Sequence, residues 1–204
     1  MKDITIFENF INDEELEEAR QFIYVPGTTC KSIHNGQIVT DWFFYTDDNC
    51  DKKFIFEVSE FILEVSDCGI TNMTSSAIKF ISKIKNRIYK CTNKTFDLQR
   101  VYLNRQVYGQ DVPLHKDTDK FNGYTLLIYI GDITPENYDK AGGDLEFKNK
   151  EKTRVEPFTQ RAVLFKGYIP HQAYAPLVPG LTRIVFAFKF FCMSEKVPFI
   201  VKYS

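Results

Sequence analysis

The stretch PLHKDTDKFNGYTLLIYIGD, from Pro113 to Asp132, places two potential metal ligands immediately before a strongly apolar run. The run YTLLIYI is rich in β-branched and aromatic residues and is bounded by Gly and Asp, which predicts a β-strand. His115 and Asp117 are two residues apart, so in extended backbone they point to the same side. An imidazole nitrogen and a carboxylate oxygen directed at one point indicate a metal site that needs a third ligand elsewhere in the chain.

The candidate for this third ligand is His171, one of only three histidines in the chain. It follows the apolar run RAVLF in the segment FKGYIPHQAYAP. Two histidines and one carboxylate on a β scaffold form the facial triad of non-haem Fe(II) sites, which leaves coordination positions open for substrates. Zinc with the same ligands is the competing interpretation. Three hydrogen-bonded polar residues at the rim of a β-sandwich, without a metal, are the plainest alternative.

Arg183 bears on the choice between these interpretations, because it lies in the apolar segment PGLTRIVFAF. We expect this strand to pair antiparallel with the one that ends near His171, across a turn made by Pro176, Pro179 and Gly180. A guanidinium buried there without an anion would cost several kcal/mol. A dicarboxylate cosubstrate could supply that anion through a bidentate pair. The alternative for Arg183 is a surface salt bridge on an edge strand.

Length and composition favour one globular domain with no membrane partner. The 204 residues are 44% hydrophobic and 15% aromatic, and 26 basic and 27 acidic residues give a net charge of −1. This balance carries no global signature of binding to nucleic acid or to anionic membranes. The five cysteines lack CxxC pairing, and the segment MKDITIFENF lacks the apolar stretch of a signal peptide, so we expect an intracellular, cytoplasmic protein with reduced thiols.

The first half of the chain is predicted to supply helices and the second half to supply the sheet. Apolar residues recur at helical spacing in three segments, residues 13–24, 52–66 and 75–91, whereas ITIFENF and IVTDWFFYT are strand-like. Residues 27–37 are rich in turn formers, so we expect a loop or lid there, and a second lid at 132–140. From residue 96 onward, short β-like runs alternate with Gly, Pro, Asn and Asp, which predicts an antiparallel sandwich or barrel.

Several motifs in this order carry a family resemblance. HKD at 115–117, AGGDLEF at 141–147, PHQA with His171, and Arg183 twelve residues later resemble the catalytic domain of the Fe(II)/2-oxoglutarate dioxygenases. Within that superfamily the chain is most similar to the prolyl 4-hydroxylase branch. The similarity covers roughly residues 99–191, with a weaker match in ITIFENFINDEELEEA.

The resemblance implies a mainly β fold with flanking α-helices: a double-stranded β-helix, or jelly-roll barrel, braced by N-terminal helices. A single domain, 1–204, would comprise a support region, 1–95, and a catalytic core, 96–193. The resemblance implies that His115, Asp117 and His171 bind Fe(II) and are the catalytic residues. It also implies that Arg183 and Tyr129 bind the distal carboxylate of 2-oxoglutarate, that dioxygen is consumed, and that ascorbate can act as an auxiliary cofactor. The products would be succinate, CO2 and a hydroxylated substrate.

Two departures from the family pattern put the substrate in doubt. Gln106 stands where the prolyl 4-hydroxylases often carry tyrosine, and Asn122 stands where relatives often carry an arginine that contacts the substrate. A peptide, protein or amino-acid substrate is the first expectation, and the oligomeric state is left open. Alternatives are a small-molecule or nucleic-acid substrate, or a non-catalytic β-barrel binding module. Halogenases of the superfamily replace the carboxylate ligand by glycine or alanine, so Asp117 argues against that chemistry.

Overall fold

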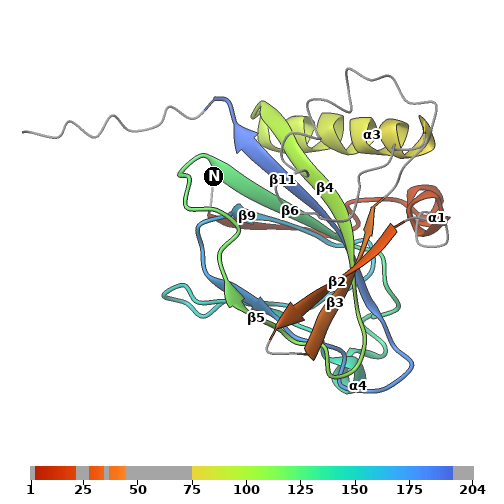
Figure 1. Ribbon diagram of the computed structural model, residues 1–204. Helices are drawn as coiled ribbons and strands as arrows, with labels where there is room; N and C mark the ends of the chain where they lie inside the picture. Colours follow the sequence, from red (N-terminus) through yellow and green to blue (C-terminus); the bar gives the residue numbers. More distant parts are fainter. Residues whose placement is uncertain (1–2, 22–27, 35–36, 45–74, 195–204) are drawn as a thin grey trace, which may run out of the picture.

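The computed structural model describes residues 3–21, 28–34, 37–44 and 75–194 (Figure 1). Its helices are α1 (Asp13–Gln21), α3 (Ser75–Thr92) and α4 (Tyr138–Ala141). Its strands are β1 (Ile4–Phe7), β2 (Thr28–His34), β3 (Gln37–Phe44), β4 (Phe96–Gln106), β5 (Val112–His115), β6 (Gly123–Tyr129), β7 (Leu145–Phe147), β8 (Arg154–Val155), β9 (Ala162–Lys166), β10 (His171–Ala173) and β11 (Arg183–Cys192). The helix expected at 52–66 lies outside the described residues.

The strands form two antiparallel sheets. The larger sheet has seven strands in the order β1-β9-β6-β11-β4-β3-β2, and the smaller has four in the order β5-β10-β7-β8. Apolar side chains of both sheets, including Leu127 and Val185 from the larger and Leu145 and Phe147 from the smaller, share one buried cluster between them. This mainly β arrangement with flanking helices confirms the predicted double-stranded β-helix. The described strands pair as two separate sheets and not as a closed barrel.

Strand β11 lies in the middle of the larger sheet and divides its side chains between two environments. Val185 and Ala187 belong to the cluster between the sheets, whereas Phe186 and Phe188 belong to a second cluster on the opposite face. This alternation follows from the two-residue period of a strand. Arg183 has the parity of Val185 and Ala187, so it faces the inner side.

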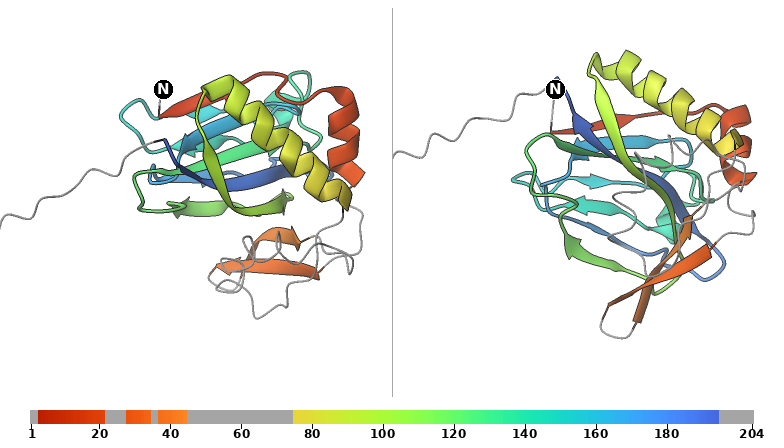
Figure 2. Two further views of the ribbon diagram at one scale, coloured as in Figure 1. Left: turned by 90° about the horizontal axis from the view of Figure 1, so that it is seen from above. Right: turned by 45° about the horizontal axis from the view of Figure 1, so that its top comes forward.

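Helix α3 covers the outer face of the larger sheet, as Figure 2 shows. Its isoleucines Ile81, Ile84 and Ile88 are all buried against that face, which confirms the predicted amphipathic helix. Helix α1 begins with a reciprocal cap: the Glu15 N–H donates to Asn12 Oδ1 at 2.9 Å, and the Asn12 N–H donates to Glu15 Oε2 at 3.0 Å. None of the described helices combines the length and the apolar character that a membrane span needs.

The structure corrects three expectations about the elements. Residues 28–34 form strand β2, which pairs with β3, and not a loop or lid. The first half of the chain therefore contributes three strands to the larger sheet: β1 and β3, which the sequence predicted, and β2, which it did not. The β-branched residues within 28–34, and the Asn-Gly pair at 35–36, are the hairpin signal that the turn-rich composition obscured. Strand β11 pairs with β4 and β6, whereas β10 lies in the smaller sheet, so the chain between them crosses from one sheet to the other.

The second expected lid, residues 132–140, is a hydrogen-bonded turn that runs into α4. Asn137 closes it by accepting from the Thr134 N–H at 2.9 Å and donating to the Asp132 carbonyl at 2.9 Å. Among the cysteines with described side chains, Cys192 is buried and Cys91 is exposed, and both are free thiols.

Candidate active site

The three predicted metal ligands come from two neighbouring strands of the smaller sheet. His115 ends β5, His171 begins β10, and the antiparallel register places them directly opposite each other. Asp117 lies just beyond β5, where its N–H and that of Thr118 donate to the Gly167 carbonyl at 2.9 and 3.2 Å. A side chain at position 167 would come within 2.8 Å of Thr118, so glycine permits this close approach. The fold therefore brings the three residues together as the sequence predicted.

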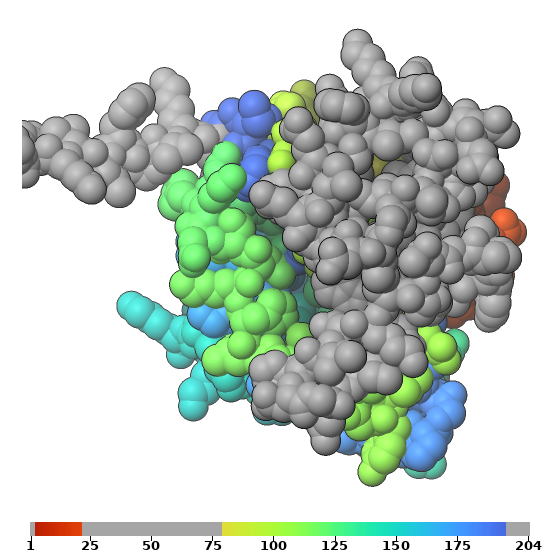
Figure 3. Space-filling view, viewed as in Figure 1, coloured from red at the N-terminus to blue at the C-terminus, as the bar shows by residue number. Residues whose placement is uncertain are grey.

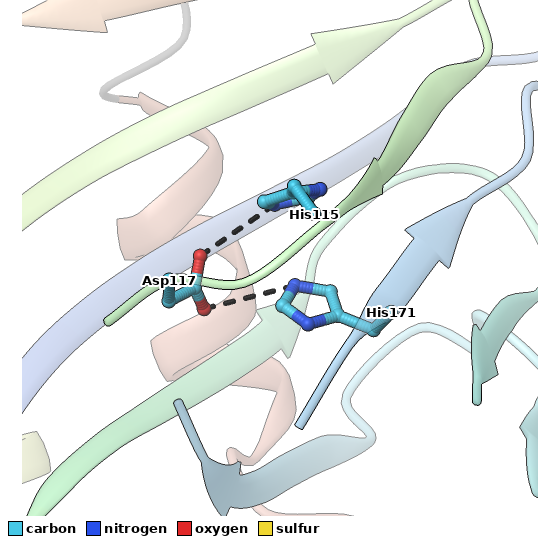
Figure 4. A group of neighbouring side chains, drawn as sticks. All are labelled: His115, Asp117 and His171. Carbon is cyan, nitrogen blue, oxygen red and sulfur yellow. Dashed lines mark ion pairs between the residues drawn. The ribbon is translucent and has the colours of Figure 1, made fainter. Parts of the chain in front are cut away.

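The two imidazole rings and the carboxylate converge, as Figure 4 shows. His115 Nε2 lies 3.6 Å from Asp117 Oδ1, and His171 Nε2 lies 3.7 Å from Oδ2. Each ring directs its other nitrogen, Nδ1, at the backbone carbonyl two residues earlier: Pro113 for His115 at 2.8 Å and Ile169 for His171 at 2.9 Å. A neutral ring whose Nδ1–H donates to a carbonyl keeps the lone pair of Nε2 for a metal.

Burial and charge favour the metal-binding protonation states of His171 and Asp117, but not that of His115. Burial lowers the pKa of His171 to about 4, so this ring is neutral at physiological pH. Burial acts to raise the pKa of Asp117, but the charge of Lys189 and the hydrogen bond with His115 outweigh it and hold this pKa well below its usual range. The hydrogen bond with Asp117 raises the pKa of His115. A neutral His171 and an ionised Asp117 are the forms that coordinate metals.

These donors fit a divalent transition metal. The three ligand atoms lie within 4.8 Å of one another, and each is free of competing protein bonds in at least one lone-pair direction. Two imidazoles and a carboxylate suit Fe(II) or zinc. The ligand set does not distinguish the two metals, but the surroundings of Arg183 add a second constraint.

Arg183 is a buried cation whose described partners are all neutral. It is 2% exposed at the start of β11. Its Nε donates to the Gly143 carbonyl at 3.1 Å, Nη1 to Gln106 Oε1 at 2.6 Å, and Nη2 to the Tyr129 hydroxyl at 3.3 Å. No carboxylate of the described residues forms an ion pair with it, so it is not the surface salt bridge of the alternative interpretation. A guanidinium has five N–H donors, so the contacts within the described part of the chain leave one hydrogen on each terminal nitrogen for a ligand.

Tyr129 and Gln106 complete the surroundings of Arg183. Tyr129 is fully buried with its ring 5.1 Å from the guanidinium carbon, and burial raises the pKa of its hydroxyl, which therefore stays protonated. Gln106, a departure from the family pattern, accepts from Arg183 while its Nε2 donates to the carbonyls of Gln110 at 2.7 Å and Ala173 at 3.3 Å. Sequence reasoning noted Gln106 but did not place it beside Arg183.

Two more side chains, missed as site residues, contact Asp117 from the larger sheet. Thr125 Oγ1 donates to Asp117 Oδ2 at 2.5 Å, and Lys189 Nζ lies 2.5 Å from the same oxygen. Lys189 follows Arg183 by six residues on one strand, so the strand period places both on the inner face. That even spacing is the signal that could have identified Lys189.

The metal-ligand group is accessible mainly through His115, since the side chains of Asp117 and His171 are both nearly buried. The segment that contains β5 and the loop to β6 is exposed along one side of the face in Figure 3. The His115 side chain is 40% exposed, whereas that of His171 is 5% exposed. Asn122, the second departure, donates to the Cys192 carbonyl at 3.4 Å in the same segment. A substrate can therefore approach from the side of His115.

No protein-family model and no curated protein matches the sequence, but solved structures match the fold. A prolyl hydroxylase from Trichoplax adhaerens, in complex with a hypoxia inducible factor oxygen degradation domain peptide, is 18% identical with a TM-score of 0.62, covering 93% of this chain and 83% of that chain. The viral collagen prolyl hydroxylase of Paramecium Bursaria Chlorella virus-1, in a 2-oxoglutarate complex, is 15% identical with a TM-score of 0.56, covering 93% and 96%.

A third match is HygX from Streptomyces hygroscopicus, whose structure contains nickel, 2-oxoglutarate and hygromycin B. It is 13% identical with a TM-score of 0.55, covering 96% of this chain and 85% of that chain. At these low sequence identities, the comparisons establish the fold of this chain. This chain has the double-stranded β-helix fold of the Fe(II)/2-oxoglutarate oxygenases, in the form that includes the prolyl hydroxylases.

Proposed function

We propose that this protein is an Fe(II)- and 2-oxoglutarate-dependent dioxygenase that hydroxylates a C–H bond of a peptide or amino acid, in the manner of the prolyl (4-)hydroxylases. The observation that carries the proposal is Arg183, a buried guanidinium with neutral described partners and two uncommitted donors, on the fold that also assembles the His115, Asp117 and His171 group. A structural zinc site or a metal-free barrel gives no reason for such a cation. A dicarboxylate cosubstrate does.

His115, Asp117 and His171 would hold Fe(II) through two Nε2 atoms and one carboxylate oxygen. Bound Fe(II) would supply the redox chemistry, in which 2-oxoglutarate and dioxygen yield succinate, CO2 and one oxygen atom inserted into the substrate C–H bond. The carbonyls of Pro113 and Ile169 keep both rings in the tautomer that coordinates.

Arg183 and Tyr129 would bind the distal carboxylate of 2-oxoglutarate. The two free N–H donors of Arg183, one on each terminal nitrogen, suit a bidentate pair with a carboxylate. The protonated hydroxyl of Tyr129 can donate a further hydrogen bond. Because both residues are almost fully buried, the pair would form in a medium of low dielectric constant, where charge-assisted bonds are strong.

Two of the structural matches bear on the substrate class. The Trichoplax hydroxylase was solved with a peptide, which supports a peptide substrate here, and the net charge of −1 does not favour nucleic acid. HygX was solved with hygromycin B, which supports a small-molecule substrate as the second candidate. The exposed His115 side of the site is compatible with either.

The test is anaerobic reconstitution with Fe(II) and 2-oxoglutarate, followed by air and a mixed library of peptides, amino acids and small molecules. We expect a substrate to gain one oxygen atom by mass spectrometry, with succinate formed in equal amount. His171→Ala should give neither product. Parallel reactions with and without ascorbate measure whether it acts as an auxiliary cofactor. Full activity of His171→Ala, or activity without 2-oxoglutarate, contradicts the proposal.

A further inference from the structure

The two oxygens of Asp117 have different surroundings. Oδ2 accepts a hydrogen bond from Thr125 Oγ1 at 2.5 Å and lies 2.5 Å from Lys189 Nζ. A carboxylate oxygen has two lone pairs, so these two donors occupy Oδ2. Each oxygen also faces one imidazole nitrogen, Oδ1 that of His115 at 3.6 Å and Oδ2 that of His171 at 3.7 Å, but Oδ1 has neither the Lys189 nor the Thr125 contact. The oxygen that is free to coordinate a metal is therefore Oδ1.

The two donors are themselves held in place by the larger sheet. Thr125 on β6 and Lys189 on β11 are directly opposed in the antiparallel register. Lys189 also donates to Thr125 Oγ1 at 3.1 Å. Thr125 is fully buried and the Lys189 side chain is 15% exposed. Since both side chains are confined and bonded to each other, rotation of Asp117 would break a network and not a single contact.

We propose that Lys189 and Thr125 are positioning residues that make Asp117 a one-oxygen metal ligand. This inference rests on the proposed function. A six-coordinate metal with three protein donors keeps roughly three open positions, and a chelating 2-oxo acid takes two of them. Carboxylates also bind metals through both oxygens, and such a bidentate Asp117 would use one of those positions. Holding Oδ2 on Lys189 and Thr125 keeps the third position open.

Mn(II) is a suitable probe, because water-proton relaxation reports how many exchangeable waters the bound ion carries. In the wild type we expect roughly three waters, which fall to roughly one when 2-oxoglutarate is added. In the double variant Lys189→Met/Thr125→Val, Oδ2 is released, and we expect about one water fewer before 2-oxoglutarate is added. The affinity for 2-oxoglutarate should then fall roughly tenfold, because the cosubstrate must displace an Asp117 oxygen, a cost of about 1.4 kcal/mol.

Two controls test whether the loss of bound water comes from the altered position of Asp117 or from the removed positive charge, and a third measurement tests for unfolding. Lys189→Arg keeps a cationic donor and should keep the wild-type water number. Arg100→Met removes a cation that is directly opposite Lys189 on β4 and should also leave it unchanged. Thermal melting monitors whether each variant folds. If the double variant does not fold, the isosteric single variant Thr125→Val replaces it, and we expect Thr125→Val to lose a smaller fraction of a bound water.

Equal water numbers in the wild type and in Thr125→Val or the double variant overturn the inference. A loss of water in Arg100→Met as large as in the double variant also overturns it, because charge alone would then explain the change. These outcomes leave the proposed function intact, since wild-type Mn(II) and 2-oxoglutarate binding is measured in the same experiment. If the wild type binds neither, the proposed function fails and the inference fails with it.

Discussion

Arg183 is a fully charged side chain in a place where the described residues offer it only neutral acceptors. If the distal carboxylate of 2-oxoglutarate is its anion, Arg183→Ala leaves that anion without its partner, a loss on the order of 3 to 5 kcal/mol. We expect the dissociation constant of 2-oxoglutarate to rise roughly a hundredfold or more in anaerobic calorimetry with metal present. Arg183→Lys keeps the charge but loses the planar guanidinium, so its dissociation constant for 2-oxoglutarate should lie between those of the wild type and Arg183→Ala.

Metal binding is the internal control for Arg183, because no predicted ligand atom belongs to it. Both Arg183 variants should bind Mn(II) as the wild type does. Wild-type affinity for 2-oxoglutarate in Arg183→Ala would remove Arg183 from the cosubstrate site and favour the zinc or non-catalytic alternatives.

Gln106 provides a second test of the anion site. Its amide oxygen accepts a hydrogen bond from Arg183 but does not neutralise the charge of the guanidinium. Gln106→Glu would place a carboxylate beside Arg183 and supply the anion that we assign to 2-oxoglutarate. We expect cosubstrate affinity to fall by at least tenfold, a loss of about 1.4 kcal/mol, while Mn(II) binding is retained. Gln110→Glu is the matched control, since the Gln110 side chain accepts from the Val107 N–H at 2.9 Å and, among the described residues, forms no hydrogen bond with Arg183. Equal losses in the two variants would show that added charge alone is responsible.

At the residue scale, the sequence identified the groups whose chemistry is unusual for their position. His115, Asp117, His171 and Arg183 stand out because polar residues beside apolar runs need a partner. Thr125 did not stand out, because its role depends on a contact across the loop between β5 and β6, which spacing within one strand does not reveal.

At the element scale, Glu146 on β7 holds the strands of the smaller sheet together. It accepts from Arg154 on β8 at 3.0 Å and from the Tyr174 hydroxyl at 3.2 Å, and it also pairs with Lys148. The hydrogen bond from Lys148, with those from Arg154, lowers the pKa of Glu146 to about 2. Because this value lies below the unfolded value of about 4.3, its contribution to stability is complete above about pH 4.3 and is lost as pH falls toward 2.

We therefore expect Glu146→Gln to melt below the wild type at pH 7, with a difference in Tm that shrinks as pH falls below about 4.3. The exposed Glu151 is the control, and Glu151→Gln should follow the wild-type curve across the same range. A difference between Glu146→Gln and the wild type that stays constant from pH 7 to pH 3 would contradict a role for the ionised carboxylate.

Long elements with a clear period were predictable, and short ones were not. The isoleucine period of α3 and the continuous apolar runs of β6 and β11 are visible in single windows of sequence. Strands β5 and β10 are only four and three residues long, and they exist because their neighbours supply hydrogen-bonding partners. The predicted pairing of β11 with the strand near His171 was wrong. The chain crosses from one sheet to the other between these strands, so neighbours in sequence are not neighbours in the sheet.

At the scale of the whole molecule, a bound metal would connect the two sheets. Its three ligands lie in or beside the smaller sheet, and Asp117 is bonded to Thr125 and Lys189 of the larger. A ligand that binds only the folded state stabilises it by about 2.7 kcal/mol at a hundredfold excess over its Kd. For a domain of this size that corresponds to a rise in Tm of roughly 5 to 10 °C.

We expect Mn(II) to produce this rise in the wild type, and 2-oxoglutarate to add to it only when the metal is present. Asp117→Ala and His171→Ala should show neither effect. A rise of the same size in His171→Ala would mean that the metal binds elsewhere on the surface.

The central claim is that this chain couples a metal site to the oxidation of 2-oxoglutarate. The most direct measurement is to load the protein anaerobically with Fe(II) and 2-oxoglutarate, admit oxygen, and quantify succinate over hours, because uncoupled turnover needs no knowledge of the substrate. We predict about one or more equivalents of succinate per protein for the wild type, an amount that follows from one cosubstrate per site, and only the background of free Fe(II) for His171→Ala and Arg183→Ala. Two results would contradict the account. The wild type could bind both ligands but form no succinate above that background, or the variants could form as much succinate as the wild type.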